Sequence, residues 1–293
     1  MKNLLIFFLL PFFFISCSSK PVDKPITIST NQWIGYSPLF YAYQKGYLKK
    51  LNIKLINSVS LGEAADVYRV GQANMVTTTQ HEYNSLNEST HDIVPIILLD
   101  RSNGGDMVLS NRSIEALKKS KKIYTYLEVD SINQEILKDF VANNSISLDK
   151  LIIINKDQEQ IHDVNFKKLK NKDVLIVTYT PYDVALKAKA FHEVASTKNI
   201  DSIIVIDALC STKELLKNDK KRLLKLKKVI DQSIDEIKQN PHQAYKTVAR
   251  YLSNINYNEF RTSLKNIKWI NKPSDDLLEF INKYHYTKET ILK

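Results

Sequence analysis

The sequence predicts an α/β fold of two lobes joined by two crossings of the chain, with a helical C-terminal segment that packs on the first lobe. Short β-rich runs alternate with helical patterns in two successive blocks, which is typical of mainly parallel α/β sheets. After Ser211 only helical patterns are readable. The length of 293 residues fits one large domain or two small lobes. Each block is small for an independent domain, so the two blocks are expected to be lobes of one protein.

The N-terminal residues 1–16 are predicted to be a lipoprotein signal peptide. Their apolar run is shorter than the roughly 20 residues that span a bilayer. Cys17 follows Phe-Ile-Ser, which resembles a bacterial lipobox, although Phe14 stands where Leu is usual. A lipid on Cys17 and a polar tether over residues 17–25 would hold the protein on a membrane surface, in the periplasm or at the cell surface. The alternative is a chance Cys in an ordinary signal peptide.

Lobe one is predicted over residues 26–110. Its first strand is expected at 26–30, where β-branched residues alternate with polar ones. Ser37 as N-cap and Pro38 in the first turn predict the start of a helix, and Gly46 predicts its end. The same signals predict the remaining elements, which are strands at 53–56, 74–78, 93–99 and 106–109 and helices at 62–70 and near Glu82.

Lobe two is predicted over residues 111–206, because the rhythm of helix and strand restarts at Ile114. The chain is expected to cross between the lobes near Ser110 and again near Asp207. The expected elements are helices at 114–118, 131–143, 157–168 and 181–188 and strands at 123–126, 151–154, 174–178 and 203–206.

Residues 207–293 are predicted to return to lobe one as helices. The longest is expected at 220–239, where Leu and Ile recur at spacings of three and four and Lys fills the opposite face. Pro241 and Pro273 stand at helix starts. The other expected helices are 213–217, 241–252, 257–266 and 275–284.

The composition is that of a folded protein without a disulfide framework. An apolar fraction of 43% with 25% charged residues can fill a core, which excludes disorder as the main state. Six Gly and eight Pro exclude collagen-like and Gly/Ser-linker architectures. With two Cys, one of them in the targeting segment, neither a disulfide scaffold nor a Cys-rich zinc module is possible.

The positive charge does not indicate a nucleic-acid partner. Lys and Arg number 42 against 32 Asp and Glu, a formal charge of +10. These charges are spread along helical faces rather than gathered in one patch with interleaved aromatic residues. The densest run, residues 220–228, is expected to be the solvated face of an amphipathic helix.

The familiar signatures of catalysis, nucleotide binding and metal binding are absent from the sequence. It holds no Gly-x-Gly-x-x-Gly, no Gly-Lys-Ser/Thr and no Gly-x-Ser-x-Gly. His81-Glu82 resembles the start of a zinc helix, but the second His is missing at position 85. Cys210 is expected to be a small buried residue, and His162-Asp163 is expected at the surface. We therefore predict no catalytic residue, no metal and no cofactor.

The loop after the first strand is the most informative segment. Trp33 and Tyr36 stand between that strand and the helix that begins at Ser37. The tip of a parallel strand beside a helix N-terminus is where α/β proteins bind ligands. Flat aromatic faces suit a ring-shaped solute. The alternative, which the loop alone leaves open, is that both are core aromatics.

This segment resembles the opening of the nitrate/sulfonate/taurine and thiamine-precursor group of substrate-binding proteins. The matching residues are WIGYSPL at 33–39 and KGYL at 45–48, with further similarity at 66–79, 99–104 and 174–182. The resemblance implies a bilobed, periplasmic-binding-protein-like (type II) fold that closes like a venus flytrap. It implies a monomeric binder rather than an enzyme. Such a protein captures a small molecule for an ABC permease in the cytoplasmic membrane, and lipid tethers are frequent in the group.

The predicted ligand-binding residues stand at expected strand ends and helix starts of both lobes, so that the two sets face one cleft. From lobe one they are Trp33, Tyr36, Thr78, Thr79, Gln80 and Ser102, and from lobe two they are Ser131, Asn133, Tyr179, Thr180 and Tyr182.

Departures from the family pattern bear on the ligand. Many members carry Trp-Glu-Pro where this chain has residues 179–181 as Tyr-Thr-Pro. Glu128 and Asp130 stand at the expected turn before a lobe-two helix, and a carboxylate 4 Å from a sulfonate repels it by about 1 to 4 kcal/mol. This favours a neutral or cationic nitrogen heterocycle, such as a thiamine pyrimidine precursor. The alternatives are that Asp130 only caps the helix, and that the ligand is a sulfonate, taurine or nitrate-type anion.

Two rival functions use the same scaffold. Some relatives of the group make the thiamine pyrimidine with an iron site and a Cys-rich motif, but this chain has only Cys210 in its body. A sensory module that binds a ligand and docks on a receptor is the second rival, and the sequence does not distinguish it from an importer subunit.

Overall fold

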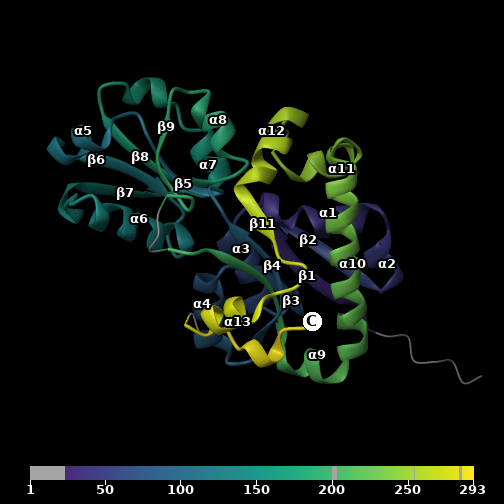
Figure 1. Ribbon diagram of the computed structural model, residues 1–293. Coiled ribbons are helices and arrows are strands. Elements are labelled where there is room, and N and C mark those ends of the chain that lie inside the picture. The colour runs from purple at the N-terminus through teal and green to yellow at the C-terminus, as the bar shows by residue number, and fades with distance from the viewer. Residues whose placement is uncertain (1–23, 200–202, 254, 284–285) are drawn as a thin grey trace, which may run out of the picture.

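The computed structural model describes residues 24–199, 203–253, 255–283 and 286–293. The predicted signal peptide, Cys17 and most of the predicted tether lie outside the described residues. Two α/β lobes are evident in Figure 1, one around each β-sheet. In the described part of the chain, no helix is long and apolar enough to cross a membrane.

The first sheet has six strands in the order β11-β4-β10-β3-β1-β2. Its parallel half is β1 (Ile26–Asn31) with β2 (Ile53–Ser58) and β3 (Met75–Thr78). The other half is antiparallel. There β10 (Ile206–Thr212) lies between β3 and β4 (Ile93–Ser102), and β11 (Ile267–Trp269) pairs with β4 at the edge.

The second sheet has five strands in the order β7-β6-β8-β5-β9. The strand β6 (Ile123–Leu127) pairs in parallel with β7 (Leu151–Asn155) and β8 (Asp173–Tyr179). The strand β5 (Asp106–Ser110) runs antiparallel to β8 and to β9 (His192–Ser196).

Helices connect the strands and cover both sheets (Figure 1). Those of lobe one are α1 (Ser37–Gln44), α2 (Tyr47–Lys50), α3 (Leu61–Arg69) and α4 (Gln80–Thr90). Those of lobe two are α5 (Ile114–Lys119), α6 (Ile132–Asn143), α7 (Gln158–His162) and α8 (Asp183–Lys187). The returning segment forms α9 (Lys213–Asn218), α10 (Lys220–Gln239), α11 (Pro241–Val248), α12 (Tyr257–Ser263) and α13 (Asp275–Asn282). Short 3-10 turns occupy Ile34–Tyr36, Leu148–Lys150, Phe166–Leu169, Ala249–Tyr251, Leu264–Asn266 and Lys288–Thr290.

The long helix α10 has the predicted bounds and the predicted apolar stripe. Its Leu and Ile residues at 223, 226, 230, 234 and 237 are buried, and the helix packs on α1 (Figure 1). Lys227 departs from the predicted solvated face, because its ammonium is buried. It bonds the Asp231 carboxylate and the Asn271 carbonyl oxygen, at 2.5 and 2.6 Å. This lysine therefore ties α10 to the segment that follows β11.

The crossing predicted near Ser110 is wrong, because β5 belongs to the second sheet. The chain leaves lobe one after β4 and enters lobe two at Asp106, so the crossing lies at 103–105. The return lies between the end of β9 and the start of β10 at Ile206, close to the predicted Asp207. The two crossing segments bond each other, since the Ser102 amide donates to the Val205 carbonyl at 3.0 Å.

Both sheets are mixed rather than mainly parallel, which corrects the expected strand directions. The strand predicted at 203–206 is instead β10, which starts where that prediction ends. The strands β9 and β11 were not predicted. β11 has only three residues and gains its strand geometry from pairing with β4, which no local pattern reveals. The predicted helix at 157–168 is divided into α7 and a 3-10 turn.

Ser37 is not the N-cap of α1. The turn Ile34–Tyr36 runs directly into the helix, so Ser37 already has helical dihedral angles. Its hydroxyl donates to the Ile34 carbonyl oxygen at 2.6 Å instead of capping the helix. The cap position belongs to Tyr36, and Pro38 stays in the first turn as predicted.

Candidate functional site

The carboxyl ends of the parallel strands of both sheets meet between the lobes. Asn31 ends β1 and Thr79 follows β3, while Tyr179 ends β8 and Glu128 follows β6. Ligands of open α/β sheets bind at this end of the strands, next to helix N-termini. The interlobe cleft is therefore the candidate site.

A small cavity lies in this cleft. It is lined by Asn31, Trp33, Leu61, Thr79, Asp106, Tyr179 and Asp207. Its volume is about 10 Å³, at the lower limit of what holds one water molecule. The lobes are thus closed on each other, and the wall of the cavity combines aromatic rings with carboxylates.

Trp33 is held tightly in this wall. Its indole N–H donates to the Asp100 carboxylate, with Nε1 to Oδ1 at 3.1 Å and to Oδ2 at 3.3 Å. Its ring meets Tyr179 edge to face, with centroids 5.8 Å apart. A Cβ atom at Gly105 would lie 2.4 Å from the ring, and one at Gly35 would lie 2.3 Å from Nε1. Trp33 is therefore both a buried packing residue and part of the cavity wall.

Tyr36 acts behind the cavity rather than in it. It is fully buried, and its hydroxyl donates to Asp207 Oδ1 at 2.5 Å. Asp207 lines the cavity, and in the sheet it stands opposite Asp100 on the neighbouring strand. Trp33 and Tyr36 thus each supply one donor to a pair of adjacent buried acids.

Burial raises the pKa of these acids. Removal from water brings the pKa of Asp100 to about 8 and that of Asp106 to about 7, and the pKa of Asp207 lies well above its usual range. Nearby carboxylates add to each rise. A cation bound among them would favour their ionised forms. The cleft is therefore suited to a solute that brings positive charge or N–H donors.

Two more carboxylates connect the lobes directly. Glu128 of lobe two accepts from the Gly62 amide at the start of α3, at 2.8 Å. Glu82 of lobe one accepts from the Ile132 amide at the start of α6, at 3.0 Å. His81 beside it pairs with Glu135 of α6 at 2.6 Å. Each lobe thus presents a carboxylate to a helix N-terminus of the other.

Three of the eleven predicted binding residues line the cleft cavity. They are Trp33, Thr79 and Tyr179. Thr79 is the N-cap of α4 and forms a capping box with Glu82. The Tyr179 hydroxyl accepts from Asn31 Nδ2 at 3.3 Å, which joins the two lobes across the cavity. Their role in binding stays a prediction.

Four other predicted residues support the crossings and sheets instead of facing the cavity. Gln80 bonds the Ile204 carbonyl and the Ile206 amide, at 2.6 and 3.2 Å. Ser102 bonds Thr197 at 2.7 Å and thereby joins the two crossings. The others are Thr78, which contacts Cys210 at 3.3 Å, and Thr180, which bonds Asp183 at 2.9 Å.

The two predicted residues at the start of α6 lie close to the interlobe carboxylates. Ser131 is the N-cap, accepting from the Asn133 amide at 3.2 Å. Asn133 is fully buried, and its side-chain amide has no partner among the described residues. Asp130 is exposed with a φ of +60° and does not cap the helix, which removes that alternative.

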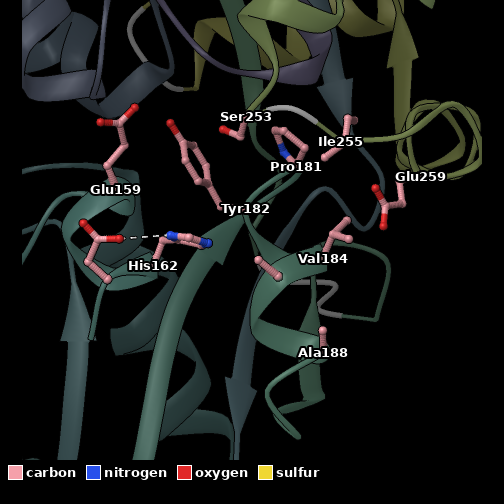
Figure 2. Close-up of a pocket in the computed structure, with 11 residues that line it drawn as sticks. Glu159, His162, Pro181, Tyr182, Val184, Ala188, Ser253, Ile255 and Glu259 are labelled. Atoms are coloured by element: carbon pink, nitrogen blue, oxygen red, sulfur yellow. Dashed lines mark hydrogen bonds and ion pairs between the residues drawn. The ribbon is translucent and has the colours of Figure 1, made fainter. Parts of the chain in front are cut away.

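A larger cavity, of about 430 Å³, lies beyond Tyr182 (Figure 2). Tyr182 was predicted in the cleft, but it lines this outer cavity. Its ring packs edge to face on Tyr179, with centroids 5.5 Å apart, so the two tyrosines stand between the cavities. Glu159 of α7 and Ser253 of the returning segment flank the Tyr182 hydroxyl in Figure 2. Gln32 bonds both of them, at 3.3 and 3.0 Å.

Sequence reasoning missed Asn31, Leu61, Asp106 and Asp207 as lining residues. The sequence places Asn31 in the same loop as Trp33, directly after the predicted first strand, so its position was a usable signal. Asp106 and Asp207 begin or nearly begin strands, where an acid is expected to face solvent. Their burial arises from the meeting of the two lobes and has no local signal. Among the described residues, no group of three or more His, Cys, Asp and Glu side chains could hold a metal ion.

Solved structures share this architecture. The periplasmic aliphatic sulphonate binding protein SsuA of Escherichia coli matches with a TM-score of 0.71 and 9% identity, over 90% of this chain and 86% of that one. SsuA of Xanthomonas axonopodis pv. citri, bound to MOPS, matches with a TM-score of 0.70 and 11% identity, over 92% and 98%. The periplasmic nitrate-binding protein NrtA of Synechocystis PCC 6803 matches with a TM-score of 0.65 and 10% identity, over 80% and 68%. Identities this low establish the fold alone.

The family assignment comes from the sequence itself. No curated protein sequence matches the chain. A family model described as NMT1/THI5 like matches residues 33–244, which include the Trp33 loop and all the residues around the cleft cavity except Asn31. This confirms the predicted resemblance and the predicted bilobed fold. The chain is a member of the NMT1/THI5 like family and has the fold of the periplasmic binding proteins.

Proposed function

We propose that this protein is an exported solute-binding protein that delivers a small nitrogen heterocycle, neutral or cationic, to an ABC importer. The ligand class includes thiamine pyrimidine precursors. The observation that carries the proposal is the chemistry of the cleft, where buried carboxylates stand beside aromatic rings. Attachment to the membrane through a lipid on Cys17 and a monomeric state are part of the same proposal.

The cavity wall is rich in hydrogen-bond acceptors. Asp106 Oδ2 and Asn31 Oδ1 are buried and have no partner among the described residues. A ring amino group or a protonated ring nitrogen would donate to such atoms, and hydrogen bonds to a charged partner are the stronger kind. Trp33 and Tyr179 add apolar surface for the body of the ring.

The lobes must separate before a ring can enter. A space of about 10 Å³ does not admit a heterocycle. The described residues that pass between the sheets are 103–105 on one crossing and 197–199 and 203–205 on the other, and they are the natural hinge. Binding would then consist of opening, capture and closure, with no chemical step on the solute.

An oxyanion ligand is the second candidate, since the solved relatives include sulphonate- and nitrate-binding proteins. The acids of the cleft argue against it. A sulfonate or nitrate would meet Asp106 and Asp207 in the cavity wall and would gain no cationic side chain there. The enzyme alternative lacks a reactive thiol, because Cys210 is buried and its pKa is raised to about 12 by burial. A sensory role differs from import only in the membrane partner.

The test is a comparison of ligand classes on the whole exported domain. An aminopyrimidine with the thiamine substitution pattern is expected to raise the melting temperature, because a ligand at 100 times its dissociation constant adds about 2.7 kcal/mol of stability. Taurine and nitrate are expected to leave it unchanged. Stabilisation by taurine or nitrate, with none by the pyrimidine, would overturn the proposed ligand class. Titration calorimetry on the same samples gives the affinities.

A further inference from the structure

The helices α3 and α6 point their N-termini into the cleft from opposite lobes. They have nine and twelve residues, so each is long enough for a helix dipole. Ser60 caps α3 and Ser131 caps α6, and each cap satisfies one backbone amide. Further amides at these ends remain available to an anion, which a helix N-terminus attracts.

In this protein those further amides are taken by its own carboxylates. Glu128 Oε1 lies 2.8 Å from the Gly62 amide, the second residue of α3. Glu82 Oε1 lies 3.0 Å from the Ile132 amide, the first residue of α6. Both side chains are buried, with 6% and 3% exposure for Glu128 and Glu82. The pairing is reciprocal, because each carboxylate comes from the lobe opposite to the helix it caps.

Glu82 is fixed in place before the lobes meet. Its second oxygen, Oε2, accepts from the Thr79 amide at 3.0 Å and from the Thr79 hydroxyl, within the capping box of α4. All of these atoms belong to lobe one. The first oxygen is thereby aimed at lobe two, and closure brings it to the Ile132 amide without rearrangement of the side chain.

Glu128 can approach the start of α3 because residue 62 is a glycine. A Cβ atom at Gly62 would lie 3.2 Å from Glu128 Oε1, closer than an ordinary contact. Position 62 therefore leaves room for the carboxylate oxygen at the start of α3. The two helix ends are thus occupied by different means. Glu82 is held in place by the capping box of α4, and Glu128 reaches α3 because Gly62 has no side chain.

We infer that Glu82 and Glu128 are specificity-determining residues, which stand in for a bound anion at the starts of α6 and α3 and so exclude oxyanions when the lobes close. This inference rests on the proposed solute-binding function and sharpens it. An oxyanion that sought these amides would have to displace a buried carboxyl oxygen that already accepts a hydrogen bond from each of them. A solute that donates hydrogen bonds has no need of these amides and is not opposed.

The experiment removes the two carboxylates from the starts of α3 and α6 and measures whether anions bind more tightly. Inorganic sulfate and methanesulfonate serve as probes in titration calorimetry. Glu128→Ala frees the Gly62 amide, and Glu82→Gln removes the charge while its amide can still serve the α4 capping box. We expect each variant to bind sulfate about fivefold more tightly than the unchanged protein, which is the usual effect of one helix terminus on an anion. The double variant should gain more than either.

Glu115→Ala is the matched control. This carboxylate is exposed on α5 of lobe two, with 74% of its side chain accessible, so its removal changes the net charge and one exposed ion pair with Lys118 but no contact of the cleft. Should Glu128→Ala fail to fold, Glu128→Gln replaces it, with a thermal melt as the check of folding. Tighter sulfate binding by the folded Glu82 and Glu128 variants, but not by Glu115→Ala, supports the inference, even if no pyrimidine binds. Unchanged sulfate affinity in these folded variants, or an equal increase in Glu115→Ala, overturns it.

Discussion

The two lobes contribute to the cleft in different ways. Lobe one supplies a pair of acids already held by protein donors, since Trp33 bonds Asp100 and Tyr36 bonds Asp207. Lobe two supplies Asp106 and Tyr179, which are partners across the β5–β8 pair, and Asp106 Oδ2 has no bond among the described residues. In the binding function that we propose, lobe one is therefore a prearranged half-site, and Asp106 Oδ2 of lobe two is an acceptor that a solute would complete.

Removal of the Trp33 ring is expected to have the largest effect. It should lower the stability of lobe one as well as the affinity for the solute. Trp33→Ala leaves a cavity and deprives the buried Asp100 of its donor, so we expect a loss of about 3 to 5 kcal/mol of stability. Thermal and denaturant unfolding measure it. Trp33→Phe keeps an aromatic ring in the pocket but loses the N–H and part of the packing, so its loss of stability should be smaller. A melting temperature unchanged in Trp33→Ala would contradict the prearranged half-site.

Neutralising the acids one lobe at a time tests where the solute binds. Asp106→Asn and Asp207→Asn are each expected to weaken binding of a cationic aminopyrimidine by roughly 10- to 150-fold, the value of one charged hydrogen bond. Asp163→Asn is the control, because that side chain is exposed in the outer cavity. Calorimetry gives the affinities. Full affinity in Asp106→Asn would mean that lobe two only covers the ligand.

The acids of the two lobes are also expected to titrate at different pH. Burial raises the pKa of Asp106 and Glu128 in lobe two to about 7, and that of Asp100 in lobe one to about 8. In the unfolded chain these groups release their protons near pH 4. Their contribution to stability is therefore complete below about pH 4 and is lost as the pH rises through 7 and then 8.

Melting temperatures of the ligand-free protein between about pH 5 and pH 9 should show this decline. Affinity for a cationic ligand should rise over the same range, because the ligand binds to the ionised acids. Asp106→Asn is expected to reduce the decline near pH 7, where Glu128 keeps its own share, and to leave the part near pH 8. A melting temperature that rises across this window would contradict the assignment.

The smallest effect is expected from Gln32, which bonds Glu159 of lobe two and Ser253 of the returning segment. These are exposed hydrogen bonds, so Gln32→Ala should change stability by less than about 1 kcal/mol. It should shift the ligand-free protein toward the open state, because it removes a link between the lobes. Small-angle scattering would detect a larger radius of gyration. An unchanged profile would show that the remaining contacts between the lobes hold them together without Gln32.

The sequence predicted those elements whose structure depends on the spacing of their own residues. The 3.6-residue period of α10 and the β-branched run of β1 identify elements whose burial follows from their own spacing. Trp33, Thr79 and Tyr179 could be predicted from the sequence as cavity residues, because strand ends converge in α/β folds. Asp106 and Asp207 were not, because an acid near a strand start looks solvent-exposed until another lobe covers it. The position of β5 was hidden for the same reason, since sheet membership depends on partners distant in sequence.

The strand order of lobe one also has a consequence for how the chain folds. The strand β10 lies between β3 and β4 but follows both in sequence by the whole length of lobe two. During synthesis, the sheet that contains Asp100 and Asp207 therefore cannot be completed until residue 212 has emerged, whereas lobe two is one continuous segment. Such distant pairing slows folding. In the exported protein that we propose, this strand delays the completion of lobe one, the half of the molecule that holds the prearranged acids.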